Sequence, residues 1–257
     1  MNDELVARLA RDAPALSASV LAAMHEHPFW LERFANDARK FAAEDGQQHV
    51  AHVMQAVSAR DPAVLTRYAR WRRSLLTARG LCTLHLEQYF ERLARAIGAT
   101  IDDAAVATEY LREACLALCY DRDPARELQE AMPRLADAAA AEFERAHPHA
   151  ISVWGTRGEV AHRDDILHYL SYLSDAAEGL EVDGFSNYVE FVYSNAIERG
   201  RHAELVIAAL GELSTLVAHD RVLSASAKAF CARAFEDAGQ RIAARAVTRP
   251  VDTRSTP

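Results

Sequence analysis

The apolar residues of this chain recur every three or four positions over most of its length, which is the spacing of amphipathic helices. In the first half this pattern predicts a long helix from about residue 28 to 59, with Gly46 as a candidate break. Asp61-Pro62 opens the next helix, because proline is tolerated in the first helical turn. That helix is expected to end at Gly80, a third at Gly98, and a fourth to run from Asp102 to Tyr120.

The same pattern continues in the second half. Asp123-Pro124 opens a fifth helix, which Pro133 is expected to kink or divide. Further helices are predicted over residues 160–178, 184–198, 202–218 and 224–246. The stretch from His147 to Gly158, which holds one proline and two glycines, is the best internal boundary.

These elements predict an all-α helical bundle of about nine to ten helices. We expect an N-terminal domain over residues 1–146, a C-terminal domain over 147–246, and a disordered tail over 247–257, which lacks periodicity. The pattern leaves open whether the two halves form two bundles or share one core.

The two halves also repeat a phrase, which indicates two diverged copies of one unit. Asp45 and His49 return about 119 residues later as Asp164 and His168. The residues that follow match as well: Tyr68, Trp71, Ser74, Arg79 and Gly80 in the first half, and Tyr188, Phe191, Ser194, Arg199 and Gly200 in the second.

Charge and composition exclude some functions. Of the 257 residues 50% are hydrophobic, as in ordinary globular proteins, and the formal net charge of -8 disfavours a nucleic-acid partner. The one basic cluster, Arg67, Arg70, Arg72 and Arg73, is interpreted as the solvated face of a helix whose inward face carries Tyr68, Trp71 and Leu75. The four cysteines lack metal-site spacing, and no signal peptide or membrane-spanning run is evident, so we expect a reduced cytoplasmic protein.

A polar stripe at the edge of the core is the main candidate for chemistry. Asp45, His49 and His52 lie at i, i+4 and i+7 of one helix, and Asp164 and His168 repeat the arrangement. Carboxylate and imidazole groups at this spacing can share a metal ion, as in helical bundles that hold iron. The candidate metal ligands are therefore Asp45, His49, His52, Asp164 and His168.

A structural role for the same residues is favoured, because the neighbouring helix offers no inward acid to complete a metal site. In this interpretation Asp45 and Asp164 accept hydrogen bonds from the histidines and from Arg79 and Arg199. Arginine suits that role because its planar fork pairs with a carboxylate through two bonds.

Catalysis finds little support in the sequence. The nucleotide-binding, hydrolase and zinc-protease motifs are missing, and Cys82, the cysteine nearest to a reactive setting, is interpreted as a core or capping residue. The pairs His25/His27 and His147/His149 are weaker ligand candidates.

One set of residues in the first half consists of Glu44-Asp45, His49, Asp61-Pro62-Ala63, Tyr68, Trp71, Arg79-Gly80-Leu81 and His85-Leu86. This set resembles helical modules found ahead of cobalamin-binding or STAS domains in bacterial signalling proteins. The resemblance covers about residues 28 to 97, with a fainter second copy. It implies a sensory or regulatory role without catalytic residues. No recognisable cobalamin-binding or STAS domain follows, so the output would come from a separate partner.

Two functions therefore stand as hypotheses. The first is a non-catalytic helical regulator that binds a small molecule or a protein, or associates with itself, through the aromatic residues Phe185, Tyr188, Phe191 and Tyr193. The second is a metal or haem protein that uses the duplicated Asp-His stripes, with iron, haem or cobalamin as candidate cofactors. The leading expectation is that no cofactor is bound.

Overall fold

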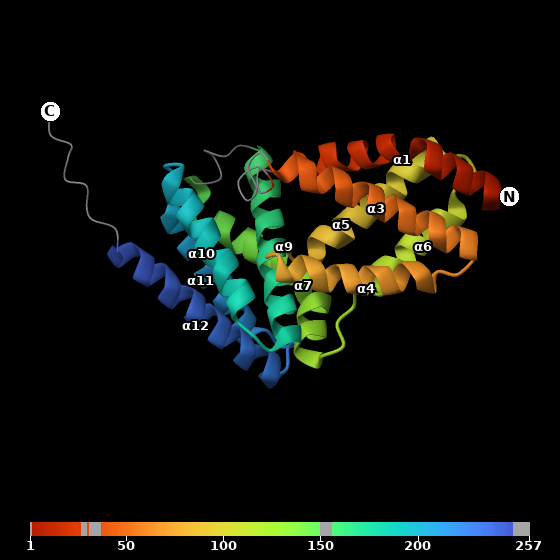
Figure 1. Cartoon of the computed structure of the whole chain (residues 1–257). Helices are drawn as coiled ribbons and strands as arrows, with labels where there is room; N and C mark the ends of the chain where they lie inside the picture. Colours follow the sequence, from red (N-terminus) through yellow and green to blue (C-terminus); the bar gives the residue numbers. More distant parts are fainter. Residues whose placement is uncertain (1, 27–29, 31–36, 150–155, 249–257) are drawn as a thin grey trace, which may run out of the picture. The chain divides into compact units, whose positions relative to one another are not determined.

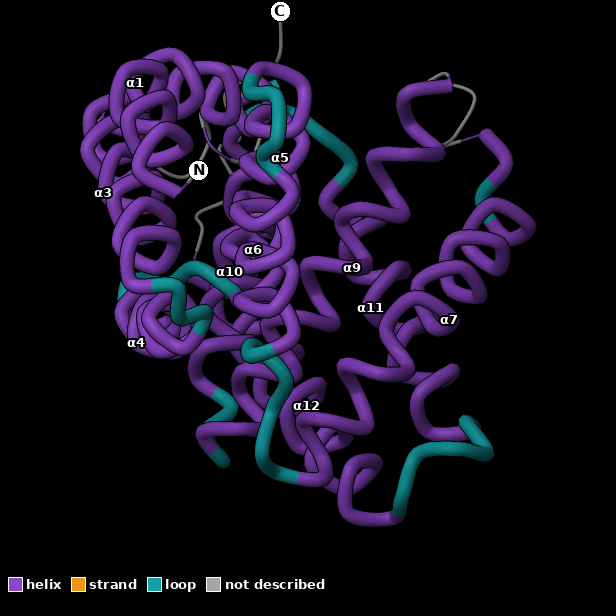
Figure 2. The backbone as a smooth tube through the Cα atoms, turned by 90° about the vertical axis from the view of Figure 1, so that its right-hand side faces the viewer, coloured by secondary structure: helices purple, strands orange, loops and turns teal. Residues whose placement is uncertain are grey.

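The computed structural model describes the backbone of residues 2–26, 30, 37–149 and 156–248, and all regular structure in those ranges is helical (Figure 2). The prediction of an all-α protein is therefore confirmed. These residues form ten helices, and none of the helices in the described ranges is apolar over enough of its length to cross a membrane.

The chain divides into two compact units, Met1–Cys119 and Tyr120–Pro257. The division falls after Cys119, one helix earlier than the boundary that composition placed at residue 147. The physical reason is that helix α7 packs along α9 and also contacts α11 and α12, so it belongs with the helices that follow it.

Unit 1 contains α1 (Asn2–His25), α3 (Asp37–Ala59), α4 (Ala63–Ala78), α5 (Thr83–Thr100) and α6 (Ala105–Leu116). Helices α1 and α3 lie side by side and make the largest contact of the unit (Figure 1). Helix α5 packs on α1 and α6, and α4 bridges α3 and α6. The core is lined by buried apolar residues of all five helices.

Helix α1 is absent from the elements predicted by the sequence, and Pro14 within it explains why. A proline usually interrupts a helix, because it lacks an N–H group and its ring clashes with the preceding turn. The buried residues Leu9, Leu16 and Val20 show that the helix nevertheless packs one continuous face on the unit. Pro133 is likewise tolerated inside α7, so the predicted division of that helix is wrong.

Gly46 lies within α3 and does not end it. A Cβ atom at this position would lie 2.8 Å from the Tyr89 hydroxyl and 3.1 Å from the Ser17 Cβ. The missing side chain therefore lets α1 and α5 approach α3 closely, and it does not serve as a helix break.

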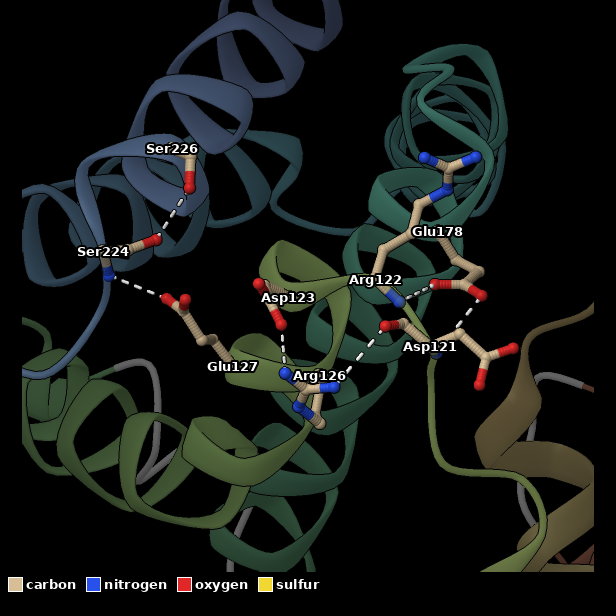
Figure 3. Close-up of polar contacts among 8 residues, drawn as sticks. All are labelled: Asp121, Arg122, Asp123, Arg126, Glu127, Glu178, Ser224 and Ser226. Atoms are coloured by element: carbon tan, nitrogen blue, oxygen red, sulfur yellow. Dashed lines mark hydrogen bonds and ion pairs between the residues drawn. The ribbon is translucent and has the colours of Figure 1, made fainter.

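Unit 2 contains α7 (Asp123–Ala146), α9 (Thr156–Gly179), α10 (Asp183–Glu198), α11 (Ala203–His219) and α12 (Ala225–Thr248). Acidic side chains join the ends of its helices (Figure 3). Glu178 of α9 accepts hydrogen bonds from the backbone N–H groups of Asp121 and Arg122, at 3.4 and 3.0 Å. Glu127 of α7 accepts one from the Ser224 N–H at 2.7 Å. These contacts satisfy backbone donors just before α7 and α12.

The turns of the two units match at a shift of 120 residues. Arg60 after α3 and Leu180 after α9 both have a positive φ, of 55° and 59°. The next residue in each turn returns a hydrogen bond to the helix, from Asp61 to Ala56 and from Glu181 to Ala176. Gly80 and Gly200, also with positive φ, follow the next helix in each unit, and Gly80 was the predicted end. Glycine suits this left-handed position because it has no Cβ atom.

Candidate functional site

A buried histidine stands at the centre of unit 1. His49 of α3 is 3% exposed, and its Nδ1 lies 2.9 Å from the hydroxyl of Tyr68 on α4. The rings of Tyr89 and Phe90 on α5 approach the imidazole with centroids 4.3 and 5.4 Å away. Three helices therefore meet around one polar group, whose hydrogen bond offsets part of the cost of burying it.

A buried arginine lies in the same region. Arg72 of α4 is only 2% exposed, although it belongs to the cluster that the sequence placed on a solvated face. Burial of the imidazole, with smaller contributions from the charges of Arg72 and His52, holds the pKa of His49 well below its usual range. His49 is therefore neutral near pH 7. We call His49, His52, Tyr68 and Arg72 the His49 cluster.

The ring of Tyr68 connects this cluster to the surface. His52 stacks on Tyr68 with a centroid distance of 3.6 Å and an interplanar angle of 14°. On the same ring Trp71 packs at 5.9 Å, and the Trp71 side chain is 55% exposed. Helix α4 therefore buries the arginine of the Trp71–Arg72 pair and exposes the tryptophan, the reverse of the sequence prediction.

The exposed side of α4 is strongly basic. The helix carries four arginines and no acidic residue. The side chain of Arg67 is 68% exposed and lies 3.9 Å from Asp61, a separation at which a solvated pair contributes little. Arg70 donates to the carbonyl oxygen of Ala117 at 3.3 Å while remaining exposed. We call Arg67, Arg70 and Trp71 the α4 surface.

A second polar group in unit 1 has a capping role. The backbone N–H of Cys82 donates to Nδ1 of His85 at 3.1 Å, at the beginning of α5. The imidazole also contacts the ring of Trp30 edge-on at 5.1 Å. Cys82 is fully buried. Its interpretation as a core or capping residue is therefore confirmed.

Unit 2 has aromatic residues where unit 1 has the histidines. Tyr188 of α10 stacks on Tyr172 of α9 at 3.9 Å and 13°, and meets Tyr169 at 5.4 Å. Subtracting 120 from these numbers gives Tyr68, His52 and His49. His52 likewise stacks on Tyr68, and His49 meets Tyr68 edge-on at 5.6 Å and 70°. At this shift of 120 residues the position that corresponds to His49 is Tyr169, one residue beyond the His168 that the sequence comparison aligned with it.

Elsewhere in unit 2, His162 packs against Phe143 with a centroid distance of 4.1 Å. Burial, with a smaller contribution from His147, lowers the pKa of His162 to about 4. His147 in turn lies 3.3 Å from a carboxylate oxygen of Glu212, whose own pKa burial raises. These contacts of His147 and His162 hold the end of α7 against α9 and α11. Of the two histidines, the sequence analysis singled out only His147.

The predicted metal ligands do not converge in the part of the chain that is described. The side chain of Asp45 lies outside the described residues. Nδ1 of His49 is engaged by Tyr68, while Nδ1 of His52 and of His168 bonds the backbone oxygen four residues earlier, at 2.8 and 2.7 Å. Among the described side chains, no three His, Cys, Asp or Glu residues are placed to share a metal ion.

The arginines of the predicted Asp-Arg network lie at the ends of their helices. Arg199 is exposed, and its Nε donates to Asn195 at 3.0 Å. The backbone oxygen of Asp164 lies 2.7 Å from Nδ1 of His168. Arg79 is exposed at the end of α4 and contributes its backbone N–H to the turn. Each arginine follows the last turn of its helix, so its side chain is surrounded by solvent and by that same helix.

The predicted aromatic interface lies largely inside unit 2. Phe185, Tyr188 and Tyr193 are buried, and Phe191 is partly exposed. Phe185 contacts Phe235 of α12 edge-on at 5.4 Å, so these rings hold α10 and α12 together. The burial of three of these four rings weakens the hypothesis that they form an external docking patch.

The α4 surface was missed because tryptophan is usually assigned inward and arginine outward. A signal was present, since Arg72 lies four positions after Tyr68 and four before Leu76, and therefore on the same face of α4 as these apolar residues. Comparisons of the chain with protein-family models, curated proteins and solved structures find no match.

Proposed function

We propose that this protein is a non-catalytic regulatory protein that acts by binding a protein partner through the α4 surface of unit 1. The observation that carries the proposal is the exposed ring of Trp71, 55% accessible and flanked by Arg67 and Arg70. Tryptophan and arginine are the residue types most enriched at the energetic centres of protein interfaces.

The support beneath Trp71 fits a binding role. Its ring packs on Tyr68, which is held by the hydrogen bond to buried His49 and by stacking on His52. A contact residue fixed in this way loses little conformational entropy when it binds. The one strongly perturbed histidine of the site, His49, is buried and engaged in this bond, which favours a structural role for it over a chemical one.

We further propose that the two units are diverged copies of one module, in which unit 1 kept a partner surface. The matched turns at Arg60 and Leu180, the matched glycines, and the matched aromatic contacts of Tyr68 and Tyr188 support this. Where the first unit has Arg67 and Trp71 on α4, the second has Asn187 and Phe191 on α10.

The test is affinity capture from cells that naturally produce the chain, using the full-length protein and two variants. Trp71→Ser removes the exposed ring of the α4 surface, and Ile207→Ser removes an exposed apolar side chain of unit 2, itself 50% accessible. We expect a protein that is retained by the unmodified chain and by Ile207→Ser, and is lost with Trp71→Ser. If Trp71→Ser changes no retained protein, the proposed function is wrong.

A further inference from the structure

The fifth helices of the two units differ in length. Helix α12 has 24 residues and α6 has 12, although both begin at matching positions, Ala225 and Ala105. Residues 237–248 of α12 therefore have no counterpart in α6. The contacts that this second half of α12 makes in unit 2 show which contacts have no counterpart in unit 1.

In unit 2 the second half of α12 pairs with the side of α10 through two arginines. Arg241 donates to Asn187 at 2.6 Å and forms an ion pair with Asp183, and Arg245 pairs with Glu190 at 2.5 Å. Ile242, between the arginines, is buried. The side of α10 that carries Asp183, Asn187 and Glu190 is thus covered by a helix of opposite charge.

In unit 1 the corresponding helix, α6, ends at Leu116 and has no second half that could cover α4. The last turn of α6 is held by α4, because Arg70 and Arg73 donate to the carbonyl oxygens of Ala117 and Leu118 at 3.3 and 2.9 Å. Basic side chains at a helix C-terminus also complement its dipole. Leu116, in that last turn, is 57% exposed. An apolar side chain is therefore accessible where α6 stops.

The charges at the uncovered positions are reversed. Subtracting 120 from Asn187 and Glu190 gives Arg67 and Arg70, so α4 carries two cations where α10 carries an amide and a carboxylate. An α12-like helix with arginines would be repelled there. A helix with carboxylates at the same positions would pair with α4, as α12 pairs with α10.

We propose that α4 docks an acidic amphipathic helix of a partner protein, in the place that the second half of α12 occupies on α10. This proposal rests on the proposed function and names the chemistry of its partner. The docked helix carries two Asp or Glu residues four positions apart, in place of Arg241 and Arg245, and an apolar residue after the first, in place of Ile242. Trp71 and Leu116 supply exposed apolar contacts beside the arginines.

A second copy of this chain does not satisfy that chemistry through its own α12, because Arg241 and Arg245 have the same sign as Arg67 and Arg70. The occupant of this proposal is a different polypeptide that carries the carboxylates. Its affinity should fall with added salt, because exposed charges at the edge of an interface are screened.

The experiment uses two synthetic peptides of residues 225–248, each with Cys231→Ser and a fluorescent label. One keeps Arg241 and Arg245, and the other has Arg241→Glu and Arg245→Glu. Binding to the full-length protein is followed by fluorescence anisotropy. We expect the acidic peptide to bind at least about tenfold more tightly than the basic one, about the effect of 1.4 kcal/mol.

The variant Arg67→Glu leaves the contacts of Arg70 and Arg73 with the end of α6 in place. It should weaken binding of the acidic peptide and remove most of its advantage over the basic one, because the introduced carboxylate and Arg70 then cancel in charge. Circular dichroism is used to check that this variant is folded. Equal affinity of the two peptides, binding of neither, or an acidic-peptide affinity unchanged by Arg67→Glu would overturn the inference.

The two proposals fail separately. A partner that requires Trp71 but tolerates Arg67→Glu keeps the proposed function and removes the acidic helix. When no captured protein depends on Trp71, the proposed function fails, whatever the peptides do.

Discussion

Units 1 and 2 share their turns and the geometry around one tyrosine, and they differ in what surrounds that ring. Tyr68 is contacted by His49 and His52, and Tyr188 by Tyr169 and Tyr172 at nearly the same distances and angles. At the position of buried Arg72 the second unit has Val192, which is partly exposed. The comparison teaches that helix packing can be kept while the chemistry inside it changes.

The largest expected effect comes from the position at which the units differ most. Arg72→Ala should destabilise the protein by about 2–5 kcal/mol, because it empties the volume of a long side chain in a core that cannot fully collapse. Val192→Ala, the matched change in unit 2, should cost about 1 kcal/mol, because that side chain is partly exposed. Urea unfolding followed by circular dichroism measures both. Equal losses would remove the distinction between the two positions.

The second test compares glycines. Gly46→Ala should destabilise by about 1–3 kcal/mol, because the new Cβ atom meets Tyr89 and Ser17 at distances that require movement. Gly211 lies inside α11 with no atom within 4 Å of a new Cβ, so Gly211→Ala should stabilise by about 0.5–1 kcal/mol. Thermal unfolding of both variants gives the signs. A stabilising Gly46→Ala would show that α1 and α5 can yield.

A third test concerns the bond between Tyr68 and His49. Tyr68→Phe should cost about 1–3 kcal/mol, because Nδ1 of a buried imidazole loses its partner. His49→Phe combined with Tyr68→Phe should cost less than the sum of the single changes, since both polar groups then leave the core. Urea unfolding of the four proteins gives the coupling energy. Simple additivity would mean that the bond contributes nothing.

The effect that is smallest near neutral pH is a dependence on pH in unit 2. The folded-state pKa of His162, about 4, lies below the value of about 6.5 expected in an unfolded chain. The stability associated with keeping it neutral is therefore present above pH 6.5 and is lost as the pH falls towards 4. The loss should approach about 1.4 kcal/mol per pH unit.

His162→Phe should remove that part of the slope while keeping a ring against Phe143, and His202→Gln, an exposed control, should leave it unchanged. Unfolding free energies measured from pH 7 to pH 4 separate the two variants. The idea fails when the slope of His162→Phe equals that of the unmodified protein.

Much of the fold was predictable because it depends on local signals. Gly80 and the Asp61-Pro62 pair mark turns that the structure has, and the helices around them follow the apolar spacing. Helix α1 and the continuity of α7 were not predictable in this way. In both, packing of a long apolar face outweighs the cost of an internal proline, and that packing depends on helices distant in the sequence.

The site was predictable only in part. His49 was correctly singled out, but its partner is Tyr68, because the hydroxyl from α4 reaches the imidazole across the contact between the two helices. His168 was aligned with His49, yet Tyr169 is the residue that contacts Tyr188, as His49 contacts Tyr68. One residue corresponds to a rotation of about 100° around a helix, so a shift of one position exchanges a facing side chain for a neighbouring one.

The sequence by itself determined most of the helices, most of their ends and the acidic balance of the chain, because these depend on residue type and on spacing along the backbone. The tertiary structure decided that Arg72 points inward and Trp71 outward. Two adjacent residues at the edge of an apolar face cannot both point into the core. The packing of the neighbouring helices against that face decides which of the two is buried.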